Sequence, residues 1–146
     1  MNLTIRKMTE EDLEPLHRLL SDPGVMRYLE PPFTRERTAE FLEKAMSDAP
    51  PVRAVEKDGE FIGYVIWHGY EEDTMELGWV LLPEYWGKGY ASALTKQLME
   101  LTAAQGKKPV IECDPEQPVT KHIAEKLGFV WTETTDGLDV YRISDR

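Results

Sequence analysis

The stretch ELGWVLLPEYWGKGYA, residues 76–91, decides the fold of this chain. Its apolar first half predicts a strand, and its second half predicts a short loop and then a helix that begins at Tyr90. Gly87 and Gly89 stand just before that helix, where missing side chains let backbone N–H groups approach a ligand, and a helix N-terminus favours anions. The spacing therefore predicts a phosphate-binding loop, with a tight loop that merely starts a helix as the alternative.

Two well-known phosphate-binding patterns do not match this loop. A P-loop needs Gly-x-x-x-x-Gly-Lys-Ser/Thr, which these residues do not supply. A dinucleotide fingerprint ends on Gly or Ala where this chain has Ser92, and the sequence predicts only one strand–helix–strand unit. A nucleotide or dinucleotide binder that uses Gly87 and Gly89 therefore stays a minor alternative.

Hydrophobic periodicity on both sides of this stretch predicts one α/β domain spanning residues 1–146. Hairpin turns at 57–59 and 136–137, with one strand–helix–strand crossover, predict a mixed, mostly antiparallel sheet of about seven strands flanked by about four helices. The expected strands are residues 3–8, 52–56, 60–68, 74–82, 109–114, 129–134 and 138–143. Four helices are expected. The first two begin after the N-cap residues Thr9 and Thr34, and the other two span residues 90–104 and 119–127. Breaks are expected at residues 21–24 and 30–33. The side chains expected to face the core are Leu13, Leu16, Leu19, Leu20, Ala39, Leu42, Met46, Tyr90, Leu94, Leu98, Leu101, Val119, Ile123 and Leu127.

Composition excludes several classes of protein. The chain has 146 residues, 41% hydrophobic and 30% charged, as in an ordinary globular domain. Its 17 basic and 27 acidic side chains give a net charge of −10, which disfavours nucleic-acid binding and suits either an amine substrate or simple solubility. No apolar run could span a membrane, no signal-peptide core is present, and Cys113 has no intrachain partner, so we expect a cytoplasmic protein. Three scattered histidines predict no metal site.

Two segments resemble the GCN5-related N-acetyltransferases, in particular the branch of ribosomal-protein N-terminal alanine acetyltransferases. Residues 86–91, WGKGYA, are similar to that family's acyl-CoA motif Gln/Arg-x-x-Gly-x-Gly/Ala, with Trp86 at the first position. Residues 117–129, QPVTKHIAEKLGF, are similar to its Asn-x-x-Ser…Glu-Lys-Leu-Gly-Phe segment, with Gln117 and Thr120 in place of Asn and Ser. Residues 25–29 also resemble that branch.

The resemblance implies acetyl-CoA as the acetyl donor. In the family, the strand before the phosphate-binding loop diverges from its neighbour and its backbone bonds the pantetheine arm, while the loop amides meet the pyrophosphate. Gly78 within that strand fits a bulge or a close approach. The cofactor-binding residues implied in this chain are Val80, Leu81, Leu82, Gly87, Lys88, Gly89, Tyr90, Ala91 and Gln117.

The implied reaction is direct attack of a primary amine on the thioester in a ternary complex. The amine must be neutral, so we expect Glu76, directly or through water, or else His68, to accept its proton. Many relatives have a tyrosine that acts as the general acid where this chain has Ala124. We therefore expect that Thr120 or water protonates the thiolate, or that the thiolate leaves without protonation. We interpret Cys113 as a packing residue.

The first two helices, their connection at residues 23–33 and the last hairpin are expected to build the acceptor pocket, with Arg27, Tyr28, Glu30 and Phe33 lining it. The resemblance implies a protein N-terminus or a small-molecule amine as the acceptor, and family members occur as monomers and homodimers. A non-catalytic acyl-CoA-binding module is the alternative, because the tyrosine is missing and the motif departs at Trp86.

Overall fold

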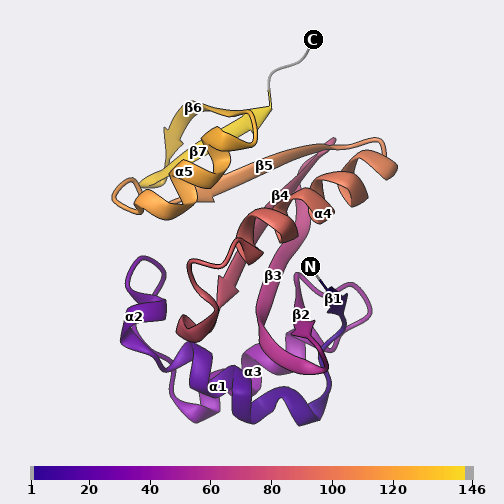
Figure 1. Ribbon diagram of the computed structural model, residues 1–146, viewed down its shortest axis with the longest axis vertical. Helices are drawn as coiled ribbons and strands as arrows, with labels where there is room; N and C mark the ends of the chain where they lie inside the picture. The colour runs from indigo at the N-terminus through magenta and orange to yellow at the C-terminus, as the bar shows by residue number, and fades with distance from the viewer. Residues whose placement is uncertain (1, 144–146) are drawn as a thin grey trace.

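A computed structural model describes residues 2–143, and its centre is a single seven-stranded sheet with the order β1-β2-β3-β4-β5-β7-β6 (Figure 1). Neighbouring strands run antiparallel except β4 and β5, which are parallel, so the predicted mixed sheet is confirmed. The strands are β1 (Leu3–Arg6), β2 (Val52–Lys57), β3 (Glu60–Glu71), β4 (Thr74–Leu81), β5 (Lys108–Cys113), β6 (Phe129–Thr135) and β7 (Leu138–Ile143).

Five helices accompany the sheet in residues 2–143: α1 (Leu13–Leu20), α2 (Pro23–Met26), α3 (Arg35–Ala45), α4 (Tyr90–Ala104) and α5 (Pro118–Lys126). The additional one is α2, which falls where the sequence predicted only a break. Asp22 starts it, because its carboxylate accepts the amides of Gly24 and Val25 at 2.8 and 3.1 Å, and Pro23 suits the first helical position. No helix in the described part is long and apolar enough to cross a membrane.

Two hydrophobic cores lie on opposite faces of the sheet. One packs α4 and α5 against it, through fully buried residues that include Leu94, Leu98 and Leu77. The other packs α1, α2 and α3 against the opposite face, through residues that include Leu16 and Leu42. Figure 1 shows α1, α2 and α3 gathered at the lower end, with α5, β6 and β7 at the upper end. Each face of the sheet is therefore covered along part of its length.

Three residues predicted to face the core are exposed, and in each of these helices an adjacent residue is buried in their place. Ala39 is exposed, and Leu101 and Val119 are 44% and 61% exposed. In each case the buried residue is a threonine directly adjacent in sequence: Thr38 before Ala39, Thr102 after Leu101 and Thr120 after Val119. The Thr102 hydroxyl donates to the Leu98 carbonyl at 2.7 Å and accepts the Trp67 indole N–H at 3.0 Å, so its polar atom costs little when buried.

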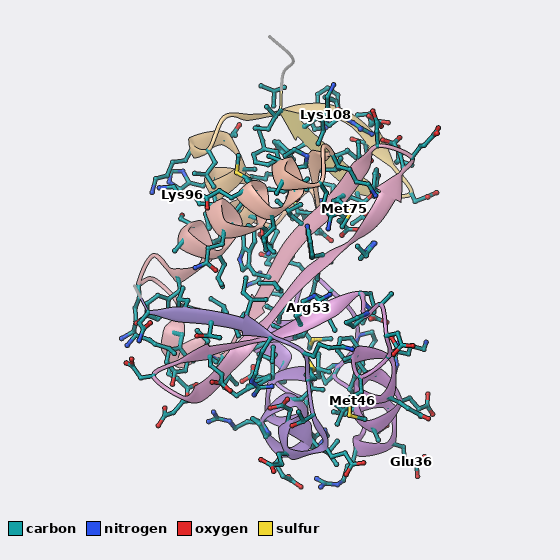
Figure 2. The ribbon with its side chains drawn as sticks, turned by 90° about the vertical axis from the view of Figure 1, so that its right-hand side faces the viewer. Glu36, Met46, Arg53, Met75, Lys96 and Lys108 are labelled. Atoms are coloured by element: carbon teal, nitrogen blue, oxygen red, sulfur yellow. The ribbon has the colours of Figure 1, made fainter. Side chains whose placement is uncertain are left out.

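The parallel strands β4 and β5 stay together for only three residue pairs, from Thr74–Lys108 to Glu76–Val110. Beyond them β4 continues beside β3 as far as Leu81, while β5 continues beside β7 as far as Cys113. Figure 2 shows Met75 and Lys108 in the upper half of the molecule, at the paired ends, and Glu36 of α3 and Met46, just after α3, in the lower half. The two strands separate toward the end that α1 and α2 cover, and this separation opens a cleft.

Candidate active site

A cleft of about 60 Å³ lies where β4 and β5 separate. It brings together five of the candidate site residues predicted from the sequence, although they come from three separate parts of the chain. These are Tyr28, Glu76, Val80, Gln117 and Thr120. The other residues that line it are Leu29, Ile66, Gly78, Trp79, Ile111, Glu112, Cys113 and Asp114.

The backbone of β4 faces the cleft at alternate residues. Leu82 donates its amide to the Ile62 carbonyl at 2.9 Å, and Val80 is the partner of Tyr64 two residues further along the same register. Hydrogen-bonded pairs alternate along an antiparallel ladder, so the backbone groups of Leu82 and Val80 point to β3. Those of Trp79 and Leu81 consequently point away from β3, toward the gap. Of the predicted stretch 80–82, Leu81 therefore presents its backbone to the cleft.

Glu76 and His68 form a cross-strand pair at the mouth of this gap. They are directly opposite each other on β4 and β3, and the His68 Nε2 lies 3.3 Å from the Glu76 Oε1. The Glu76 side chain is 17% exposed and lines the cleft, whereas His68 is 39% exposed and lies one strand further away. The Glu76 carboxylate raises the pKa of His68, against the opposing effect of partial burial.

The imidazole of His68 has a defined orientation. Its Nδ1 lies 2.9 Å from the Gly69 carbonyl oxygen, which can only accept a hydrogen bond. In the neutral ring, Nδ1 therefore carries the proton and Nε2 is left as an acceptor that faces Glu76. A single proton between Nε2 and the carboxylate relieves the repulsion of two acceptors, which explains the raised pKa.

Two further carboxylates make the cleft acidic: Glu112 and Asp114 at the end of β5. Glu112 accepts the Tyr70 hydroxyl at 2.6 Å, and this bond raises the pKa of that phenol. Neither residue was predicted from the sequence to belong to the site. The only signal for them was the predicted strand 109–114, because nothing in the sequence states where β5 pairs along β4.

The predicted phosphate-binding loop has the backbone it needs. Gly87 and Gly89 have φ angles of +71° and +82°, which side-chain-bearing residues rarely adopt, and a Cβ on Gly87 would have no atom within 4 Å. Ala93 donates its amide to the Gly89 carbonyl at 3.2 Å as α4 begins. The amides of Tyr90 and Ala91 precede this bond, so they have no partner within the helix. These unpaired N–H groups give the start of α4 a partial positive charge, and the exposed Lys88 lies beside them in the sequence.

On the β5 side, α5 begins at the cleft. The Gln117 side chain caps it by accepting the Thr120 amide at 2.7 Å, and Thr120 is only 8% exposed. Burial raises the pKa of the Cys113 thiol to about 11, so the thiol stays protonated at neutral pH. This agrees with a packing role for Cys113. Ala124, at the position of the family's tyrosine, is fully buried.

The expected acceptor residues divide between two hollows. Tyr28 lines the cleft, while Arg27 and Glu30 line a second hollow of about 340 Å³. Leu29 lines both and is 49% exposed, so the two are adjacent. Phe33 instead lies in the core at 7% exposure, with its ring against Phe41. No group of three or more potential metal ligands occurs in residues 2–143.

Comparison with known proteins identifies the class of this site. The family model "Acetyltransferase (GNAT) domain" matches residues 2–130. The structure resembles the crystal structure of a GNAT-family acetyltransferase from Bacillus anthracis, with a TM-score of 0.84 and 30% identity, covering 97% of this chain and 93% of that one. The fold is therefore that of the GNAT acetyltransferases, and the chain belongs to this family.

Characterised relatives support the same assignment. The spermidine N(1)-acetyltransferase of Escherichia coli K12 is 31% identical over 137 residues, which cover 88% of this chain and 73% of that protein. The spermidine N-acetyltransferase of Vibrio cholerae, solved in complex with CoA and spermine, has a TM-score of 0.78 and 25% identity, covering 97% of this chain and 93% of that one. The protein is thus an acetyl-CoA-dependent N-acetyltransferase, which confirms the predicted enzyme class and cofactor over a binding module or a dinucleotide binder.

Proposed function

We propose that this enzyme acetylates the primary amine of a cationic acceptor by direct attack in the cleft between β4 and β5, with Glu76 as the base. One observation carries the proposal. The Glu76 carboxylate lines the cleft at the point where the two strands separate and contacts a histidine of defined orientation behind it. The amine, the carboxylate and the thioester can then meet in one place, and this proximity supplies much of the rate acceleration of a bisubstrate site.

The residues of the cleft fit acetyl-CoA, which supplies the thioester that the amine attacks. The outward-facing backbone of Trp79 and Leu81 suits the amides of a pantetheine arm, and the apolar side chains of Val80 and Leu82 stabilise the strand from the opposite core. The amides from Gly87 to Ala91 suit a pyrophosphate, with Lys88 as a nearby countercharge. Gln117 holds the start of α5 beside them.

The proton of the acceptor ammonium passes to the Glu76–His68 pair. Glu76 is the nearer acceptor because it lines the cleft, and the proton is then shared with His68 Nε2. His68 is more exposed than Glu76, so it can release the proton to solvent. The neutral amine that remains has the lone pair required for attack on the thioester carbon.

The N–H of Leu81 or Trp79 is placed to stabilise the oxyanion that forms during attack, because both point into the gap. As the carbon–sulfur bond breaks, the attacking nitrogen loses a second proton and the thiolate gains one. The proton is relayed through the Thr120 hydroxyl or through water, so free CoA thiol leaves and Thr120 ends the step as a hydroxyl. Thr120 is the hydroxyl-bearing residue at the β5 side of the cleft and is almost fully buried. Cys113 is not a nucleophile in this reaction, because its raised pKa keeps the thiol protonated at neutral pH.

The charge of the cleft indicates the acceptor. Glu76, Glu112 and Asp114 line it together, beside the aromatic ring of Tyr28, and the whole chain carries a net charge of −10. Such a surface attracts amines that carry additional positive charge. The similarity to spermidine acetyltransferases favours a polyamine. The resemblance to the N-terminal alanine acetyltransferase branch favours a peptide α-amine as the second acceptor to test.

The first experiment is thermal unfolding with acetyl-CoA, CoA and NAD in parallel. A ligand at 100 times its Kd adds about 2.7 kcal/mol of stability, which raises the Tm of a domain of this size by several degrees. We expect both CoA species to raise the Tm and NAD to leave it unchanged.

Release of free CoA thiol is then followed with spermidine and with an alanine-terminated peptide, each beside a form in which every primary amine is acetylated. Thiol release with spermidine, abolished by acetylating the acceptor, supports the proposal. Binding of acetyl-CoA without thiol release from any amine would overturn it.

A further inference from the structure

Trp86 is a large apolar side chain that is 50% exposed, yet it is not free. Its indole N–H donates to the Leu81 carbonyl at 2.8 Å. The side chain therefore turns back from the loop to the end of β4. Four residues separate the two partners, so the bond closes the loop between β4 and Gly87 into a ring.

The Leu81 carbonyl that accepts this bond has no partner strand on its side of the sheet, because β4 and β5 have already separated at this point. Leu81 points its backbone into the gap between β4 and β5, and the residue is only 5% exposed. A buried carbonyl without a hydrogen-bond donor destabilises the folded state. Trp86 satisfies it and leaves the Leu81 N–H facing the cleft.

Tyr85 packs against both cores and Glu84 accepts a hydrogen bond from Arg18 at 3.2 Å, but within residues 2–143 the loop makes no other side-chain hydrogen bond to β4. The turn at Pro83–Tyr85 is held by the Tyr85 amide to the Leu82 carbonyl at 2.9 Å and by the Trp86 amide to the Pro83 carbonyl at 3.1 Å. The Tyr85 hydroxyl reaches Glu60 on the surface at 3.3 Å. Gly87 and Gly89 then follow, and glycine is the residue that least restricts the backbone. Trp86 is thus the last side chain that fastens the loop before the phosphate-binding amides.

We infer that Trp86 is a positioning residue that holds the phosphate-binding loop, residues 87–91, in register with the backbone of β4. The inference rests on the proposed function, because it assumes that one acetyl-CoA molecule contacts both the loop and the strand. A ligand that contacts both the loop and the strand gains affinity from both contacts only if the distance between loop and strand is fixed before it binds. The Trp86–Leu81 bond sets that spacing.

The covalent geometry of the side chain predicts which substitutions keep this role. The indole Nε1 is four bonds from Cα, and so are the Nε2 of Gln and the Nε of Arg. Gln and Arg are the residues at the first position of the motif that this segment resembles. Trp86→Gln therefore keeps a donor at the same reach, whereas Trp86→Phe keeps an aromatic ring and removes the donor.

The test compares Trp86→Phe, Trp86→Gln and wild type by calorimetric Kd for CoA and by kcat and KM for acetyl-CoA. Loss of one neutral hydrogen bond predicts a Kd and a KM about 3- to 10-fold higher for Trp86→Phe, with kcat unchanged at saturation. Trp86→Gln should stay within about 2-fold of wild type. Trp131→Phe is the matched control, because Trp131 is 56% exposed and its indole donates to Asp139 at 3.2 Å on the distant β6–β7 hairpin.

Each result has a defined meaning. Wild-type Kd and KM in Trp86→Phe would overturn the inference and leave the proposed function intact. Equal weakening of Trp86→Gln and Trp86→Phe, each with a wild-type Tm, would assign the role to the ring and also overturn it. If Trp86→Phe does not fold, the Trp86→Gln variant decides. A wild-type Kd for CoA in Trp86→Gln would support the positioning role of the hydrogen bond, and a weakened Kd would refute it. A wild-type protein that fails to bind CoA would instead overturn the proposed function.

Discussion

Gly63 on β3 is the position where one added methyl group tests the geometry of the cleft most directly. Its φ is +154°, and a Cβ built on it would lie 2.1 Å from the Val80 carbonyl oxygen and 2.8 Å from the Leu81 Cα. Both are backbone atoms of β4, so no side chain can move to relieve the clash. A carbon–oxygen contact needs about 3.3 Å, and β4 must therefore move by about 1 Å relative to β3 in Gly63→Ala.

The magnitude follows from this displacement. Overpacking of this kind costs about 1–3 kcal/mol, and the positive φ adds about 1 kcal/mol for a residue with a Cβ. Unfolding entropy scales to about 300 cal/mol/K for a chain of this length, so each kcal/mol lowers the Tm by about 3 °C. Gly63→Ala should lose about 2–4 kcal/mol and about 6–13 °C of Tm. Val80 lines the cleft, so a shift of β4 should also change the cleft. We therefore expect the Kd of the Gly63→Ala variant for acetyl-CoA to rise at temperatures where the variant is folded.

The measurement is urea unfolding together with thermal melting, followed by calorimetry with acetyl-CoA well below the Tm. Gly69→Ala is the control, since it adds the same methyl group to the same strand and a Cβ there has no atom within 4 Å. A Tm loss in Gly63→Ala that is no larger than the loss in Gly69→Ala would refute the reasoning. It would mean that β3 and β4 are not packed as tightly at the cleft as the structure shows.

Three further predictions follow from the site. Glu76→Gln should lower kcat by about 10²- to 10⁴-fold while the KM for acetyl-CoA stays near wild type; an unchanged kcat between pH 6 and 9 would show that another group is the base. The pKa of His68 is raised by Glu76, so the stability from this pair is complete below the ordinary histidine pKa and is lost as pH rises through the raised value. The stability difference between wild type and His68→Gln in urea should therefore shrink from pH 5 to pH 9, and a growing difference would contradict the assignment. Gly89→Val should raise the Kd for CoA at least tenfold, whereas Gly106→Val, with a similar positive φ of +71° at the other end of α4, should lower stability and leave the Kd unchanged.

The parts of the fold that were predictable are those that local chemistry determines. The bounds of α4 agree at both ends, because Gly89 and Gly106 interrupt the helical pattern on either side. The two hairpins agree for the same reason, since Asp58 and Asp136 adopt positive φ angles beside glycines in their turns. In these segments a few neighbouring residues carry the whole signal.

The site was predictable only where it is continuous in sequence. The loop from Gly87 to Ala91 and the strand before it could be recognised together, because both ligand-facing parts occur in one stretch. Glu112 and Asp114 could not, because they reach Glu76 only through the parallel pairing of β4 with β5. That register depends on how α4 crosses between the two strands, and the sequence contains no local signal for it. Phe33 was selected for its position in the chain, whereas the contact with Phe41 places it in the core.

The two-residue period of β4 explains how one strand can serve both substrates at once. Trp79 and Leu81 turn their backbone to the gap, where an amide-bearing cofactor can pair with it as another strand would. Glu76, Gly78 and Val80 alternate with them and line the cleft. Gly78 lies between Glu76, the proposed base, and Val80, and a Cβ there would come within 3.0 Å of the Ile66 side chain. In the proposed mechanism, the absence of a side chain at Gly78 keeps clear the part of the cleft between the Glu76 carboxylate and the β4 N–H groups that are proposed to stabilise the oxyanion.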